Sequence, residues 1–78
     1  MPTYQVVKQT TANHNPKIGL ITFRHNRSKV FYNLEEAQKN LKQSAKDIHA
    51  DENIYLVEDD TRTIEAWDHQ ERRIKQII

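Results

Sequence analysis

The longest periodic segment of the chain is polar over most of its surface and apolar along one stripe. Its apolar side chains recur every three or four residues, the spacing of one face of an α-helix. Asn33 precedes the segment and Glu36 follows three residues later, which is the arrangement of a capping box. We therefore expect an amphipathic helix over residues 33–48. Its predicted apolar face comprises Leu34, Ala37, Leu41, Ala45 and Ile48.

Shorter segments rich in β-branched and aromatic residues predict strands on both sides of this helix. Residues 4–8, 18–25 and 29–32 precede it, and residues 53–58 and 62–67 follow it. Turn-forming residues between these segments predict loops at residues 10–17, 25–28, 49–52 and 59–61.

The stretch 18–25 is the most apolar part of the chain. Its large apolar side chains fall on both faces, which predicts a central strand that is covered at least partly on each side. The loop after it is short, so this stretch and residues 29–32 are expected to pair as an antiparallel hairpin. The only glycine, Gly19, lies within the predicted strand, where a bulge or a close backbone approach would explain it.

A second capping pattern occurs near the C-terminus, where Asp68 is followed three residues later by Glu71. It predicts a short helix over residues 69–78, which must be stabilised by packing because so short a helix is unstable alone. The expected element order is thus β-β-β-α-β-β-α. This order indicates an α+β fold: an antiparallel sheet of four to five strands with the long helix across one face and a short C-terminal helix. The chain of 78 residues is short enough to form one small domain, 1–78.

Composition narrows the class of protein. The chain has no cysteine, which excludes disulfides and thiolate metal sites and favours a cytoplasmic location. Its first residues lack the charged start and apolar run of a signal peptide, and no apolar stretch is long enough to span a membrane. We therefore expect no membrane association.

The net charge of +1 hides an uneven distribution. Residues 1–34 carry five basic side chains and no acid, a balance of +5. Residues 35–78 carry the other seven of the twelve basic side chains and all eleven acids, a balance of −4. Such polarity either steers a partner or a second copy, or is neutralised across the folded surface.

Basic residues cluster at the predicted turn between residues 18–25 and 29–32. Arg and Lys at the tip of two paired strands are suited to phosphate contacts, and two-stranded ribbons enter nucleic-acid grooves. The alternative is a solvated turn whose charges protect a sheet edge. The candidate contacts are Arg24, His25, Arg27 and Lys29, with Arg72 and Arg73 as a second cluster that could extend the surface or balance the acidic middle of the chain.

An apolar cluster near the C-terminus is the candidate surface for protein contact. By strand alternation, Trp67 falls on the face opposite Ile64 and Ala66, where an uncovered indole would anchor a partner. The terminal isoleucines then form either a lid over this face or half of a symmetric dimer contact. The candidate interaction residues are Trp67, Ile74, Ile77 and Ile78.

No pattern of catalytic or metal-ligating residues stands out. The His and carboxylate residues match neither a helical ligand pair nor an EF-hand loop, and there is no nucleophile elbow or glycine-rich phosphate loop. We therefore expect no cofactor, no metal and no enzymatic activity. The sequence favours a small accessory or regulatory domain that binds a protein partner or itself, with nucleic-acid binding through the basic hairpin tip as the alternative.

Overall fold

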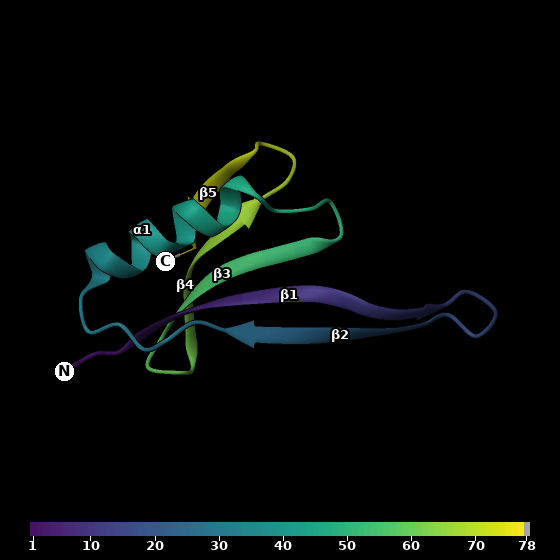
Figure 1. Ribbon diagram of the computed structural model, residues 1–78, viewed down its shortest axis with the longest axis horizontal. Helices are drawn as coiled ribbons and strands as arrows, with labels where there is room; N and C mark the ends of the chain where they lie inside the picture. The colour runs from purple at the N-terminus through teal and green to yellow at the C-terminus, as the bar shows by residue number, and fades with distance from the viewer. Residues whose placement is uncertain (78) are drawn as a thin grey trace.

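The computed structural model describes residues 1–77, which form a five-stranded antiparallel sheet with one helix across one face (Figure 1). The predicted α+β class is therefore confirmed. The strands lie in the order β2-β1-β3-β4-β5, so β2 and β5 form the two edges. The elements are β1 (Tyr4–Asn15), β2 (Leu20–Arg27), α1 (Leu34–Lys46), β3 (Glu52–Glu58), β4 (Arg62–Asp68) and β5 (Arg73–Gln76).

Helix α1 begins where its capping signal predicts. The side-chain oxygen of Asn33 accepts hydrogen bonds from the backbone N–H groups of Glu35 at 2.8 Å and Glu36 at 3.4 Å, as an N-cap does. The helix ends two residues before the predicted boundary, at Lys46, with Asp47 as C-cap. Ile48 follows the helix and still packs against the core.

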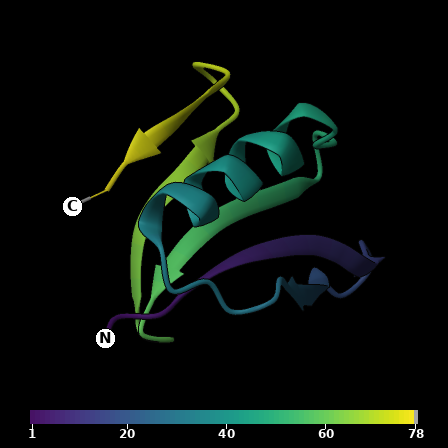
Figure 2. The same ribbon diagram turned by 60° about the vertical axis from the view of Figure 1, so that its left-hand side comes forward.

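The core lies between α1 and the inner strands β1 and β3 (Figure 2). The apolar stripe of the helix supplies Ala37, Leu41 and Ala45, all of them buried. The strands contribute the residues that alternation turns toward the helix. These strand and loop residues are Tyr4, Val6, Phe31, Ile54 and Leu56. The two strands predicted after the helix are confirmed as β3 and β4.

The predicted N-terminal hairpin is wrong in its position. Residues 10–17, expected to be a loop, mostly extend β1, which pairs with β2 from Val7 opposite Arg27 to Asn15 opposite Leu20. The turn of this hairpin is at 16–19, where Gly19 has a φ of +68° and an added Cβ atom would meet no heavy atom within 4 Å. Gly19 therefore serves a turn, not a bulge or a close backbone approach.

The predicted strand over residues 29–32 is also wrong. Only Phe31 pairs, as an isolated bridge in which its backbone N–H and C=O each bond Tyr4 at 2.8 Å. Next to it, Ser28 donates its backbone N–H to Val6 and accepts the N–H of Val6 on its hydroxyl. These contacts provide hydrogen-bond partners for the backbone of Tyr4 and Val6 without a regular strand. The chain then enters the helix.

Strand β2 is not central. It is an edge strand, and all eight of its residues are exposed. The prediction is wrong because large apolar side chains on both faces do not ensure that both faces are covered, and β2 lies beyond the helix. Figure 1 shows the β1–β2 hairpin extending along the longest axis of the molecule, past α1 and β3.

The predicted C-terminal helix is absent, and the chain forms strand β5 instead. Asp68 does accept the N–H groups of Gln70 at 2.8 Å and Glu71 at 3.3 Å, but these bonds close a turn between strands. A short helix has little stability of its own, whereas the free edge of β4 offers backbone partners and lets Ile74 lie opposite Trp67. The tertiary pairing therefore overrides the local capping signal.

The predicted alternation of β4 is interrupted as well. The pairing of β3 with β4 shifts between Leu56 and Val57, so that Ile64 is an extra residue in β4. A bulge of this kind changes the direction of the following side chains. Ile64 and Trp67, expected on opposite faces, therefore both pack against the core.

Candidate interaction surface

The outer part of the β1–β2 hairpin carries a group of exposed large apolar side chains. We call residues 10–27 the arm: the outer half of β1, the turn 16–19 and β2. Four large apolar side chains on the arm are exposed by 47–70%. They form the apolar arm patch: Ile18, Leu20, Ile21 and Phe23.

The apolar arm patch lies on both faces of the sheet. Tyr4 and Val6 face the helix, so strand alternation and the pairing with β1 put Arg24 on the helix side and Phe23 on the other. Ile21 shares the face of Phe23, and no helix covers that face of the described sheet. Ile21 and Phe23 are therefore exposed together on that face, on a strand at the edge of the sheet.

The arm carries positive charge and no acid. Arg27, at its base, donates to Gln5 at 3.2 Å and forms an ion pair with Asp60. Among residues 1–77, the side chains of Arg24 and His25 take part in no hydrogen bond or ion pair. The predicted basic cluster is thus not at a hairpin tip: Arg24, His25 and Arg27 lie along β2, and Lys29 follows the strand.

The base of the arm is joined to the body through the buried carboxylate of Glu52. This carboxylate accepts from the backbone N–H of His49 at 3.0 Å and from the hydroxyl of Thr10 at 3.1 Å, and it pairs with Lys8 at 3.2 Å. The His49 hydrogen bond holds the pKa of Glu52 below its ordinary value, against the opposing effect of burial, and Lys8 and Thr10 lower it further. These bonds join Lys8 and Thr10 of β1 to the start of β3, at the end of the pairing between the two strands.

The predicted surface around Trp67 lies near the other edge of the sheet. Trp67 and Ile74 are partly buried against the core, whereas Ile77 is 56% exposed and Ile78 lies outside the described residues. The indole N–H donates to His69 at 3.3 Å, beside a cleft of about 540 Å³ that Ile48 and Arg72 also line. A role of this surface in partner binding stays a prediction.

The C-terminal basic residues are far from the arm in the sheet. Arg72 lies in the β4–β5 turn with a φ of 55°, and Arg73 opens β5, the edge opposite β2. The structure therefore does not bring them together with Arg24 and Arg27.

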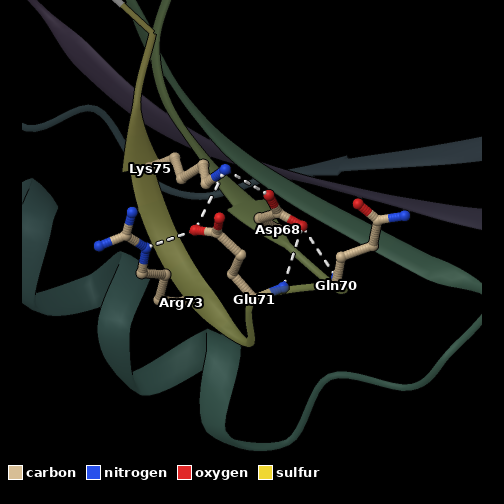
Figure 3. A network of polar contacts seen from close by, with 5 residues as sticks. All are labelled: Asp68, Gln70, Glu71, Arg73 and Lys75. Atoms are coloured by element: carbon tan, nitrogen blue, oxygen red, sulfur yellow. Dashed lines mark hydrogen bonds and ion pairs between the residues drawn. The ribbon is translucent and has the colours of Figure 1, made fainter.

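Ion pairs cover this second edge (Figure 3). Lys75 lies 3.0 Å from Asp68 and 3.1 Å from Glu71, and Glu71 also accepts from Arg73 at 2.8 Å. The Lys75 ammonium holds the pKa of Asp68 below its ordinary value, and Asp68, followed by Glu71, raises the pKa of Lys75. The basic side chains of β5 are thus neutralised locally.

An open groove of about 660 Å³ runs along α1. Phe31 lies at one end, where the Lys29 ammonium sits 5.3 Å from the ring centroid. Four lysines border the groove, and the periodic pattern of the helix predicts most of them only as solvated surface. They are Lys29, Lys39, Lys42 and Lys46.

Neither a metal centre nor a membrane span is found in the described part of the chain. Within residues 1–77, no three His, Asp or Glu side chains come together as metal ligands would. The helix in this range is too short and too polar to cross a bilayer.

The apolar arm patch escapes prediction from the sequence because residues 10–17 have the composition of a loop. A signal was present: polar residues with β-propensity, Thr10 and Thr11, precede a turn containing Pro16 and Gly19, and an apolar stretch follows at once. That pattern is compatible with a hairpin about 16–19. Hydropathy did not reveal it because this part of β1 is stabilised by pairing and not by burial.

The chain was compared with models of known protein families, with curated proteins and with solved structures, and it matches none of them.

Proposed function

We propose that this chain is a small non-catalytic accessory or regulatory domain that acts by protein–protein contact, and that it contacts a second copy of itself through the arm. The observation that carries the proposal is the apolar arm patch. Exposed apolar clusters of this kind on small proteins are typical of interaction sites. A domain of this size has few large apolar residues for its core, yet Leu20, Ile21 and Phe23 all lie outside it.

The arm is a better candidate than the surface around Trp67. Trp67 and Ile74 already pack against the core, so contact with a partner would bury only the part of these side chains that is still exposed. Ile21 and Phe23 are each 47% exposed on a strand without an outer neighbour. The free edge also offers backbone N–H and C=O groups to a further strand.

Light scattering coupled to size exclusion tests the proposal. The chain should elute at twice its 9.3 kDa mass at both about 50 mM and about 500 mM salt, because an apolar contact is little screened. The double variant Ile21→Lys, Phe23→Lys should be monomeric. Ile77→Lys is the matched control, since it adds charge at a similarly exposed isoleucine beyond β5 and should leave the dimer intact.

Other outcomes would place the interface elsewhere or exclude self-association. If Ile77→Lys gives a monomer and the arm variant stays dimeric, the surface around Trp67 is the interface and the arm is not. If the wild-type chain is monomeric at every concentration up to about 1 mM, the proposed self-association is wrong.

Nucleic-acid binding is a second candidate, favoured by the acid-free arm. A two-stranded ribbon that extends beyond the body has the shape that enters a groove, and Lys17 and Arg24 lie on it. Charge reversal, Lys17→Glu with Arg24→Glu, should then abolish oligonucleotide binding, and affinity should fall steeply with salt. Reversal of Lys42 and Lys46 on α1 serves as the control for general loss of positive charge. Equal binding by the arm variant and the wild type would exclude this function.

A further inference from the structure

The two edges of the sheet differ in how far they are protected against pairing with a further strand. Strand β5 has four residues, and its lysine and arginine form ion pairs with neighbouring carboxylates. Short edge strands and charged side chains are common ways of preventing edge-to-edge association. Strand β2 has eight residues, and its outer half is Leu20-Ile21-Thr22-Phe23, without a charge. The composition of β2 therefore suits a strand that has a neighbour on its outer edge.

We propose that β2 pairs antiparallel with β2 of a second copy, about a two-fold axis at Thr22, and joins the two sheets into one of ten strands. The inference rests on the proposed self-association and specifies its geometry. An edge strand is complementary to itself in the antiparallel sense, so a two-fold axis pairs the same residues twice. In this register Ile21 lies opposite the partner's Phe23, and Leu20 lies opposite the partner's Arg24.

The side chains on the face away from the helix select this register. Opposed residues share a face, so the Ile21 and Phe23 pairs of the two copies form one contiguous apolar row. Pairs of an aromatic with a β-branched residue are among the stabilising cross-strand pairs. An axis at Phe23 would instead oppose Ile21 to the partner's His25.

Charge argues for a second copy and for the same register. The basic inner ends of the two β2 strands point to opposite ends of the paired ribbon, so their arginines are separated. An axis at Arg24 would oppose two like charges, which is unfavourable. At the ends of the pairing the partner's Lys17 would lie opposite Arg27, and the carboxylate of Asp60, which forms an ion pair with Arg27 and has a side chain 72% exposed, would offset the repulsion between these two cations. Each arm tip would thus place its Lys17 near the exposed Asp60 carboxylate of the other copy.

A single introduced cysteine tests the register directly, because the natural chain has none. Thr22 is exposed, so Thr22→Cys should leave the fold unchanged, as circular dichroism would check. On the two-fold axis, the two Cβ atoms would lie about 4.5–5.5 Å apart, near the separation that a disulfide needs. Mild oxidation should therefore convert most of the Thr22→Cys protein to a covalent dimer on a non-reducing gel.

Arg24→Cys is the matched control. In the proposed register the two copies of residue 24 are offset by four positions, about 14 Å, and should not cross-link. A mixture of Leu20→Cys and Arg24→Cys should give the mixed dimer, because these positions are opposed. Equal cross-linking of Thr22→Cys and Arg24→Cys would overturn the register.

Light scattering on the same samples separates the two levels of the proposal. A wild-type dimer whose Thr22→Cys form does not cross-link overturns the β2 pairing while the self-association stands. A monomer without any cross-link overturns both. A monomer that shifts only with oligonucleotide at low salt also overturns the pairing and assigns the arm to nucleic acid.

Discussion

The arm and the rest of the molecule, the body, differ in burial in the opposite sense from the one that hydropathy predicts. The most apolar stretch of the sequence becomes β2, which is exposed along its whole length. Strand β3, Glu52–Glu58, has acidic residues at both ends, yet it contributes the fully buried Leu56 and even buries Glu52. The difference arises because α1 reaches over β1 and β3 but not over β2. Apolar composition shows that a strand needs cover, and topology decides whether the chain itself provides it.

The largest expected contrast between the two regions is in unfolding free energy. Leu56→Ala removes a fully buried side chain beneath α1 and should destabilise the protein by about 3 kcal/mol. Leu20→Ala, on the arm, should change the stability of the monomer by less than about 0.5 kcal/mol. Urea denaturation of both variants measures the contrast, in the monomeric Ile21→Lys, Phe23→Lys background so that association does not contribute. Similar losses of unfolding free energy for both variants would show that Leu20 is packed in the monomer and would contradict the contrast between arm and body.

A smaller contrast is expected between the turns of the two regions. Gly19→Ala places a side chain at a φ of +68° and should weaken the arm turn by about 1 kcal/mol. Since the turn belongs to the arm alone, amide exchange should accelerate by roughly fivefold in the outer arm and stay unchanged in β3. Arg72→Gly, which relieves a positive φ of 55° in the β4–β5 turn, should be neutral or slightly stabilising. A global loss of protection in Gly19→Ala would mean that the arm and the body fold as one unit.

The smallest expected effect concerns the charges that cover the β5 edge. Because Lys75 lowers the pKa of Asp68, this pair stabilises the fold above the ordinary aspartate pKa, and the contribution is lost as pH falls through the lowered value. Asp68→Asn keeps an oxygen for the turn hydrogen bonds but removes the charge. Its thermal midpoint should therefore lie below that of the wild type at about pH 7, and the difference should shrink as the pH falls below the ordinary aspartate pKa. A difference that does not change with pH would assign the role of Asp68 to the turn and not to the ion pair.

Local signals in the sequence determined the elements whose stabilising contacts are close in the chain. Helix α1 is set by its apolar period and by Asn33, both of which act within a few turns. Strands β3 and β4 follow from β-branched segments on either side of a turn that Asp59 and Asp60 make with positive φ. The α+β class followed from these elements alone.

Tertiary structure decided the elements whose partners are distant or whose local signals are ambiguous. Asp68 can cap a helix or close a turn, and pairing with the free edge of β4 selected the turn and β5. The outer half of β1 is polar and gains its strand conformation from pairing with β2, so no hydropathy pattern marks it. The exposure of Leu20, on the helix side of β2, depends on where α1 lies relative to the sheet, whereas Ile21 and Phe23 are exposed because no helix of the described chain covers the other face. That relation is a property of the packed molecule, because no residue within the arm encodes the reach of a helix elsewhere in the chain.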